Sequence, residues 1–412
     1  LQGSYNSQTA YDGNIGFLIG TLPNPSLRWE KTTTWEVGAD VSFFQNRLNL
    51  NMTYYNRLTD DKYASLILPS TTGFSSVTNN NGQLRNRGFE LEISGKIIQK
   101  RDFSWSGSAN ITYNKNTIVS LPDNELERNR QSATEVYVPG SYNPSTGKSE
   151  TMWVGGYQEG QEPGAIIGYR VVKLAHSASD FPTGYKNTTT NYFGYTQYGP
   201  DEWDKYIAAG GNSAKAVQLV PGDLIYEDIN GDGIIDQYDQ VVLGHALPHW
   251  TGGFNTTLTW KGFSVYGRFD FALGHHIANG LANDFYWYMG CMQGTYNMPT
   301  DVWDTVSDLN PDGKYPRYTW ADQFGACNYY RQSSFTVNDG SYLAVRELSL
   351  SYSVPARIME KIRGKKLELS VTGQNLGYIT KATKVFSPEQ GGSIGTTYPL
   401  PRILLFGANL TF

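Results

Sequence analysis

The chain has few charged residues and no long apolar run. Asp, Glu, Lys and Arg make up 17% of its 412 residues, below the ~25% that is typical of soluble domains. No run of about 18 or more apolar residues occurs, which argues against a transmembrane helix. The net charge of −5, with no basic block, argues against a nucleic-acid-binding protein.

Cysteine is almost absent. The only two, Cys291 and Cys327, lie in one long segment without strand character. In an exported protein such a pair forms a disulfide that closes a loop, and the alternative is two free thiols. The sequence opens on Leu-Gln-Gly-Ser-Tyr, without Met or a signal peptide. An exported protein is made with a signal peptide. If this protein is exported, we therefore expect the sequence to be a portion of a longer one.

Aromatic residues are abundant, with 29 Tyr and 10 Trp among 14% aromatics. Low charge with many Tyr and Trp is typical of a membrane barrel that carries interfacial aromatic girdles. Secreted β-rich proteins that bind carbohydrate have a similar composition. Composition alone leaves both classes open.

Alternation of apolar and polar residues favours the membrane barrel. In the last segment, 402–412, one strand face carries Leu404, Phe406, Ala408, Leu410 and Phe412, and the other becomes polar toward the end. A terminal strand that ends on an aromatic residue is typical of outer-membrane barrels. The same period predicts nine strands, which start near residues 32, 47, 86, 103, 249, 263, 342, 367 and 401.

The connections alternate in length. Short ones are expected at 44–47, 98–102, 261–262 and 355–366, and long ones at 58–85, 115–248, 274–341 and 379–399. Periplasmic turns and extracellular loops of outer-membrane barrels differ in this way. We therefore predict an all-β, antiparallel transmembrane barrel wall over 32–412, preceded by an extracellular loop and strand approach over 1–31. The β-like segments 165–172 and 224–226 are expected inside the 115–248 loop, and an even-stranded barrel needs an odd number of strands upstream.

The sharpest local motif runs from Asp228 to Asp239. Its spacing is that of a twelve-residue calcium loop, with Gly233 at the sharp turn and Asp in place of the usual final Glu. The predicted Ca²⁺ ligands are Asp228, Asn230, Asp232, the Ile234 carbonyl, Asp236 and Asp239. The ion would brace the loop. The alternative is an Asn-Gly-Asp-Gly turn without an ion.

Aromatic residues also gather in the long loops. The candidate contacts for a substrate or partner are Trp153, Tyr157, Tyr195, Trp203, Tyr206, Tyr286, Trp287 and Tyr288. Flat rings stack on sugars or pack on protein, but large loops also bury aromatics in small cores of their own. No Gly-x-Ser-x-Gly or zinc-protease motif occurs, and we expect no enzyme.

Several motifs in order resemble the C-terminal part of SusC/RagA-type TonB-dependent outer-membrane transporters. They occupy residues 24–33, 68–74, 86–91, 221–233, 340–350, 372–376 and 398–402, so the resemblance covers nearly the whole chain. It implies a plugged barrel of about 22 strands. It also implies import of oligosaccharides or oligopeptides powered through TonB, with a SusD-like lipoprotein lid.

The plug and the TonB-contacting segment of that family are not in this sequence, so this chain alone is not expected to transport. A passive porin, a surface glycan-binding or adhesion barrel, and a secreted calcium-stabilised glycan-binding protein remain alternatives. In the barrel reading, the terminal Phe412 would face the periplasm and serve as the signal for barrel assembly.

Overall fold

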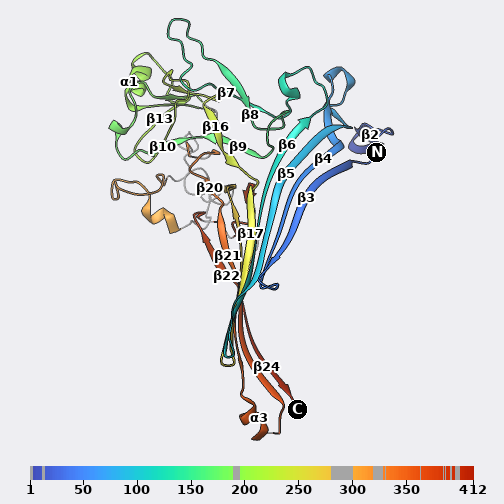
Figure 1. Cartoon of the computed structure of the whole chain (residues 1–412). Helices are drawn as coiled ribbons and strands as arrows, with labels where there is room; N and C mark the ends of the chain where they lie inside the picture. Colours follow the sequence, from blue (N-terminus) through green and yellow to red (C-terminus); the bar gives the residue numbers. More distant parts are fainter. Residues whose placement is uncertain are drawn as a thin grey trace.

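The computed structural model describes residues 3–11, 14–188, 195–279, 300–318, 328–329, 331–361, 363–383, 385, 387–389, 392–394 and 400–412. Nine strands form one antiparallel sheet in the order β24-β22-β21-β18-β17-β6-β5-β4-β3 (Figure 1). The strands are β3 (Lys31–Phe43), β4 (Leu48–Ile67), β5 (Ser76–Gln99), β6 (Phe103–Ser120), β17 (Trp250–Trp260), β18 (Phe263–Leu273), β21 (Tyr342–Ser353), β22 (Lys366–Thr380) and β24 (Ile403–Thr411). The shortest, β24, has 9 residues, and about 9–11 suffice to cross a bilayer when tilted.

Eight of the nine strands begin within two residues of their predicted starts, and β5 begins earlier than predicted. The long loop predicted at 58–85 is wrong, because β4 and β5 run on as a hairpin and leave only 68–75 between them. Two register shifts in this hairpin, at Thr59/Lys62 and Lys62/Ala64, break the alternation. Such bulges bend a strand without ending it, which is why the period-two pattern missed the extension.

The two faces of the sheet differ in chemistry, as predicted. Large apolar side chains on the outer face are exposed, with Val37 at 59%, Leu350 at 50% and Phe406 at 79%. The opposite face carries Ser, Thr, Asn and charged residues. A continuous apolar face of this size is unfavourable in water. It is the lipid-facing band of a membrane barrel. The all-β barrel fold is thereby confirmed, and Phe412, 74% exposed, continues the apolar face.

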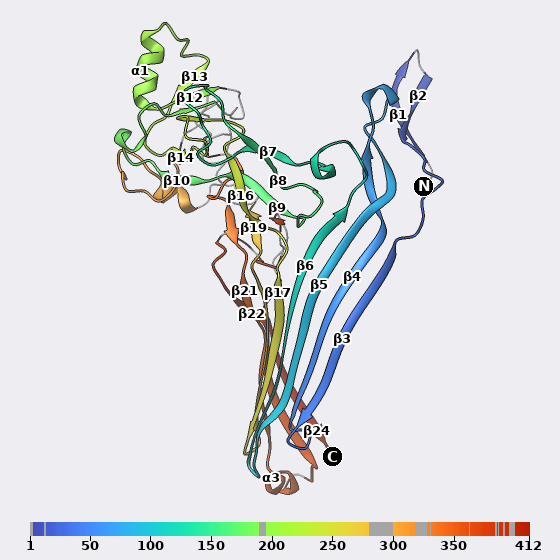
Figure 2. The ribbon, with the colours of Figure 1, turned by 45° about the horizontal axis from the view of Figure 1, so that its top comes forward.

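The short connections lie together at one end of the sheet, opposite the loops (Figure 2). They include the two-residue turn Lys261-Gly262, whose φ angles are both positive at 48° and 89°. This pairing of positive φ angles matches the twist of a tight hairpin and favours glycine. The fourth connection contains the short helix α3 (Ala356–Lys361). Among the described residues, no helix has the length and apolarity needed to cross a membrane.

The other end of the wall carries a folded loop head, formed by described residues of 121–249 together with 300–318, 328–329 and 331–336. Its elements are β7 (Thr134–Tyr137), β8 (Thr151–Val154), β9 (Ala165–Tyr169), β10 (Val171–Leu174), β11 (Lys186–Asn187), β12 (Thr196–Tyr198), α1 (Pro200–Ala208), β13 (Ala216–Gln218), β14 (Leu224–Tyr226), β15 (Ile234–Ile235) and β16 (Gln240–His245). The predicted β segments at 165–172 and 224–226 are thus found as β9, β10 and β14. Short 3-10 turns occur at 127–129, 178–180 and 300–304, and one at 70–72 caps the β4–β5 hairpin.

The head has a conventional buried core, in contrast to the wall. Leu219, Leu224, Tyr226 and Ile235 are each at most 1% exposed, and Tyr329 joins them from the second long loop. Smaller pieces complete the loop side: the hairpin β1 (Ser4–Tyr11) and β2 (Asn14–Thr21), and the sheet of β19 (His276–Asn279), β20 (Val337–Asp339) and β23 (Gly392–Ile394). Two loops distant in sequence therefore fold as one body over the wall.

Candidate functional site

The predicted calcium loop wraps its acidic side chains around its own backbone. The Asp228 carboxylate accepts hydrogen bonds from the amides of Gly231 (2.8 Å) and Gly233 (2.6 Å). Gly231 and Gly233 have φ angles of 90° and 83°, which the sharp turn requires. The Asp232 carboxylate accepts from the Ile234 amide at 2.7 Å. The chain therefore folds here as the tight loop that the spacing predicts.

The acidic groups of this loop lie close together and carry no ion pair within the described residues. Asp239 is fully buried, and its two oxygens accept the amides of Ile229 (2.9 Å) and Asp236 (2.7 Å). Burial, and then the nearby carboxylates of Asp236 and Asp228, raise the pKa of Asp239 to about 7. Tyr137 donates its hydroxyl to Asp236 (2.9 Å), and burial followed by these acids raises the pKa of that phenol.

The loop has the donors that a hard cation prefers, but they do not meet at one point. Among the described residues, no three acidic, His or Cys side chains are grouped closely enough to hold a metal ion. The side chain of Asn230, which is 1% exposed, points its amide to Ser149 (2.9 Å) and Asp232 (3.1 Å). The oxygen types and spacing fit Ca²⁺, and binding would need these side chains to turn inward.

The predicted loop aromatics fall into two groups in the head. Trp203 and Tyr206 lie on α1 and pack on each other, with ring centroids 6.0 Å apart, and Tyr206 stacks on Tyr198 at 4.6 Å. Trp153 is half-buried on β8 beneath the guanidinium of Arg130, 4.0 Å from the ring centroid. Most of these rings therefore help to hold the head together, while Tyr157 is 54% exposed.

Tyr195 is half-buried immediately before β12. The remaining predicted residues, Tyr286, Trp287, Tyr288, Cys291 and Cys327, lie outside the described residues. The disulfide and these three contacts therefore stay predictions.

A cavity at the mouth of the wall was not predicted. It has a volume of about 350 Å³ and lies where the loop-side ends of β4, β5 and β6 meet the head. Its lining consists of Lys62, Tyr63, Ala64, Ser65, Gly82, Gln83, Leu84, Ile118, Ser120, Leu121, Gln131, Tyr157 and Pro163. The mixture of apolar, hydroxyl and amide groups, with two tyrosines, is typical of a site for a small ligand.

Gln131 gives this cavity an unsatisfied hydrogen-bond donor. Its backbone pairs with that of Tyr157 in both directions at 2.9 Å, which fixes the residue at the cavity wall. The side chain is only 9% exposed, and its Nε2 has no partner. A buried amide without a partner costs about 1–3 kcal/mol, so a bound acceptor would recover this energy. Only the fold reveals this residue, because nothing in its local sequence marks it.

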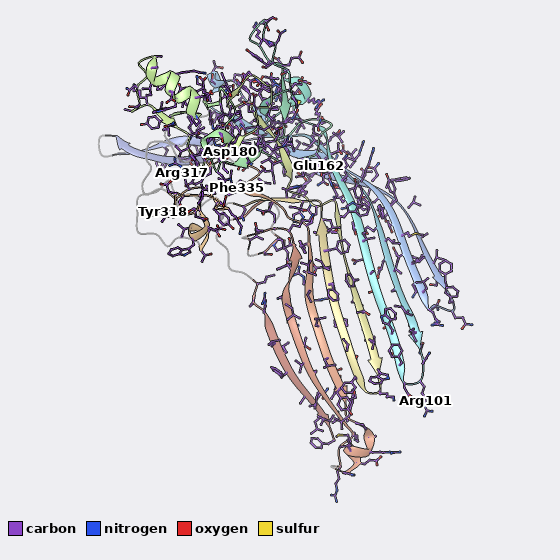
Figure 3. All side chains as sticks on the ribbon, turned by 90° about the vertical axis from the view of Figure 1, so that its left-hand side faces the viewer. Arg101, Glu162, Asp180, Arg317, Tyr318 and Phe335 are labelled. Atoms are coloured by element: carbon purple, nitrogen blue, oxygen red, sulfur yellow. The ribbon has the colours of Figure 1, made fainter. Side chains whose placement is uncertain are left out.

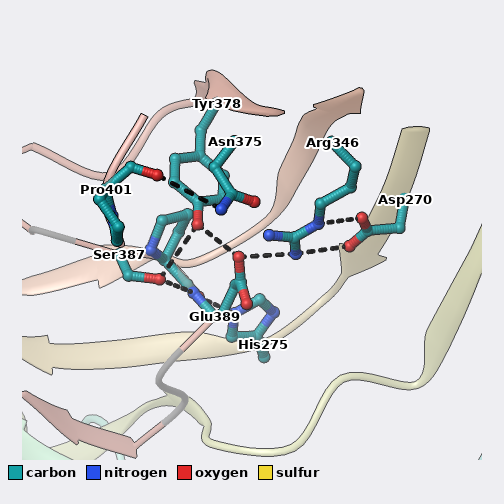
Figure 4. A network of polar contacts seen from close by, with 9 residues as sticks. Asp270, His275, Arg346, Asn375, Tyr378, Ser387, Glu389 and Pro401 are labelled. Carbon is teal, nitrogen blue, oxygen red and sulfur yellow. Dashed lines mark hydrogen bonds and ion pairs between the residues drawn. The ribbon is translucent and has the colours of Figure 1, made fainter. Parts of the chain in front are cut away.

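The lumenal face of the wall carries a polar network that links residues of β18, β21 and β22 to Glu389, which follows β22 in the chain (Figure 4). The Arg346 guanidinium donates to both Asp270 oxygens, one of them at 2.8 Å, and lies 2.6 Å from Glu389. Tyr378 donates its hydroxyl to Glu389. A cavity of about 540 Å³ beside the network is lined in part by Glu92, Asn110, Asn255, Arg268, Asp270 and Arg346.

A β-bulge aims Arg346 at this network. The registers of β21 skip Arg346 against both neighbours, pairing Val345 and Glu347 on either side. On the C-terminal side of the bulge, even-numbered residues such as Leu348 face outward. On its N-terminal side, odd-numbered residues such as Val345 face outward. Without the bulge, Arg346 would point into lipid, where a charge is costly.

A buried ion pair joins the two long loops within the head. Arg317, labelled in Figure 3, donates through Nε to Asp223 at 3.0 Å, and the side chains are 18% and 0% exposed. Asp223 also accepts the Val220 amide at 3.0 Å. The pair fixes the second loop against the core around Leu224.

The architecture defines the class of protein: an antiparallel wall of an outer-membrane β-barrel. Residues 2–162 match the family model described as "TonB dependent receptor-like, beta-barrel". TonB-dependent receptor P3 of Formosa agariphila is 29% identical over 364 residues, 88% of this chain and 31% of the relative. TonB-dependent receptor SusC of Bacteroides thetaiotaomicron is 25% identical over 396 residues, 94% of this chain and 32% of the relative.

Structural comparison agrees. The solved RagAB peptide transporter superposes with a TM-score of 0.66 at 21% identity, covering 100% of this chain and 38% of that chain. The chain is therefore similar to the barrels of SusC/RagA-type TonB-dependent receptors and lies in the outer membrane, which confirms the predicted resemblance. These relatives are receptors rather than enzymes, as expected. The chain spans about a third of the length of these curated relatives.

Removing the buried cation should loosen the head. Arg317→Met removes the guanidinium that is paired with the fully buried Asp223 carboxylate, and breaking a buried pair in this way costs about 3–5 kcal/mol. We expect a lower thermal midpoint for the head and faster proteolysis of residues 121–249 in the intact receptor.

The matched control is Arg170→Met. Arg170 pairs with Glu227 at 2.7 Å, but the side chains are 52% and 37% exposed, so its loss should cost about 1 kcal/mol or less. Equal destabilisation by both variants would contradict the role given to the buried pair.

Proposed function

We propose that this chain forms the later wall and the loops of an importer energised through TonB, which takes up oligosaccharides or oligopeptides with a SusD-like surface lipoprotein as its lid. The observation that carries the proposal is the similarity of this spanning wall to TonB-dependent receptor barrels. Its apolar outer face, polar lumen and folded head over one end fit such a receptor. In this proposal the head faces the cell exterior. Further strands join the edges at β3 and β24, and Phe412 acts as the assembly signal.

The relatives support this function without deciding the cargo. SusC and the RagAB peptide transporter share the fold, and the second is named for peptides. The alternative from another class is a passive porin or a glycan-binding adhesion barrel. The wall and its lumenal charges would suit a porin equally well. Dependence of uptake on TonB therefore distinguishes the importer from the porin.

Uptake should depend on TonB. Cells that carry the full-length receptor and its lipoprotein partner should accumulate labelled oligosaccharides or oligopeptides only when TonB is present. Deleting TonB should abolish uptake while leaving the amount of receptor in the outer membrane unchanged. Undiminished uptake without TonB would favour the porin, and surface binding without uptake would favour the adhesion barrel.

The cavity around Gln131 is our proposed cargo contact at the mouth. Its one ammonium, on Lys62, lies 3.5 Å from the Glu30 carboxylate, so the cavity offers hydroxyl, amide and aromatic groups rather than net charge. A neutral, oxygen-rich unit such as a sugar ring suits these groups best. Trp153, Trp203 and Trp287, with the neighbouring tyrosines, remain proposed contacts to cargo or lid.

Gln131→Leu should weaken cargo binding by about 1–3 kcal/mol, because it removes the donor that a ligand acceptor would satisfy. The receptor should be no less stable, since the lost amide has no partner within the protein. Calorimetry on the receptor–lipoprotein complex, with separate panels of neutral oligosaccharides and neutral peptides, measures this. Gln99→Leu, at the far end of β5, is the control. Unchanged affinity for both panels would remove the cavity from the cargo path.

We also propose that Ca²⁺ braces the 228–239 loop, held by Asp228, Asn230, Asp232, the Ile234 carbonyl, Asp236 and Asp239. The spacing of the oxygen ligands supports this, as does the positive φ angle of 83° at the Gly233 turn. Within the described residues, the four aspartates of the loop also form no ion pair with a cationic side chain. The ion would neutralise like charges that otherwise repel each other. Its role is structural.

Calcium should stabilise the head. At about 100 times its Kd, a ligand that binds only the folded state adds about 2.7 kcal/mol. Asp232→Ala or chelation should therefore increase proteolysis of the head in the intact receptor, whereas Asp204→Ala on α1 should not. Protease sensitivity that is the same with and without calcium would show that the loop is a turn without an ion.

A further inference from the structure

The short-turn end of the wall is strongly basic. Its four connections and the strand ends beside them, residues 44–47, 96–102, 261–262 and 355–366, contain ten of the 33 basic residues of the chain but only two of the 38 acidic ones. The basic residues are Arg47, Lys96, Lys100, Arg101, Lys261, Arg357, Lys361, Arg363, Lys365 and Lys366. We call this set the basic rim. Because the whole chain has a net charge of −5, the rim concentrates charge of the minority sign at one end.

The rim is solvent-exposed and largely free of internal partners. Every one of its residues is exposed. Within the described residues, Lys366 pairs with Glu368 at 2.8 Å, and no other rim residue forms an ion pair. Arg101, labelled in Figure 3, lies at the tip of its hairpin, far from the loop head. The charges are therefore available to an external partner.

A row of aromatic residues fixes the level of the rim relative to the membrane. Strand register places Phe103 opposite Trp260, Trp260 opposite Phe263, and Phe263 opposite Tyr352. Trp260 and Phe263 are 52% and 43% exposed on the outer face. Aromatic rings in such a row mark the boundary between hydrocarbon and headgroups.

The rim begins immediately beyond that row. Asp102 and Lys261 adjoin Phe103 and Trp260 in sequence, and one strand residue advances by about 3.3 Å. The Lys261 ammonium lies 5.5 Å from the ring centroid of Trp260. Arg101 and Lys261, two and one residues past the row, lie at the depth of lipid phosphates. The basic side chains farther along the connections are long enough to extend toward the same phosphates.

We propose that the basic rim binds the phosphate groups of anionic phospholipids in the leaflet that it faces. Each Lys or Arg near an anionic surface adds attraction that decays within a Debye length. The 355–366 connection contributes most, with Arg357, Lys361 and Arg363 around α3. This surface does not depend on the cargo. With the head facing the cell exterior, as proposed above, the leaflet that the rim faces is the inner one.

The test uses the intact receptor in nanodiscs of phosphatidylcholine with a minor fraction of phosphatidylglycerol. Native mass spectrometry counts the retained lipids. We expect the wild type to enrich phosphatidylglycerol. The triple variant Arg357→Gln/Lys361→Gln/Arg363→Gln should lose on the order of a hundredfold in apparent affinity at low salt, about fivefold for each cation. High salt should reduce the wild-type preference toward that of the variant.

The matched control neutralises three exposed cations of the loop head, Arg128→Gln/Lys148→Gln/Lys215→Gln, and should retain the wild-type preference. Thermal midpoints of all variants verify folding. No enrichment in the wild type, or an equal loss in the control, would overturn the proposal. Displacement of the lipid by equimolar inorganic phosphate, or binding to peptidoglycan fragments in place of the lipid, would also overturn it.

Discussion

The fold depends on one constraint: within hydrocarbon, a backbone amide or carbonyl must find its partner inside the protein. The nine-stranded ladder meets this constraint between β3 and β24. The outer edges of these two strands are where we propose that further strands join. Once each strand is hydrogen-bonded to its neighbours, its side chains point alternately to the lipid and to the lumen. The exposed apolar face, the polar lumenal face and the confinement of irregular structure to the two ends all follow.

The loop head, which belongs to the same chain, is stabilised in the way that a water-soluble protein is. Its core around Leu224 and Tyr226 is buried from water, whereas the apolar residues of the wall are exposed to lipid. The buried pair of Arg317 with Asp223 would be out of place on the outer face of the wall. The head can therefore form tight loops, and its residue Gln131 completes a cavity at the loop-side ends of β4, β5 and β6.

The sequence predicted the wall well because a strand in lipid has little freedom. Eight strand starts fell within two residues, since alternation and turn residues such as Lys261-Gly262 are local signals. The β4–β5 extension was missed because its register shifts interrupt that period. In the head, the loop at 228–239 was readable from spacing, whereas the Gln131 cavity and the Arg317 pair join residues that are distant in sequence. Contacts of this kind have no local pattern.

The bulge at Arg346 shows how the wall admits a charge. Apolar residues switch from odd positions at Leu343 and Val345 to even positions at Leu348, and the switch falls at Arg346. One extra residue therefore exchanges the two faces, as a one-residue slip must. The guanidinium enters the lumen, where Asp270 and Glu389 receive it, and the apolar band continues unbroken on both sides. A change from odd to even apolar positions beside a charged residue therefore indicates a β-bulge in the sequence. The bulge turns the charge from the lipid to the lumen, and strand pairing resumes on both sides of it.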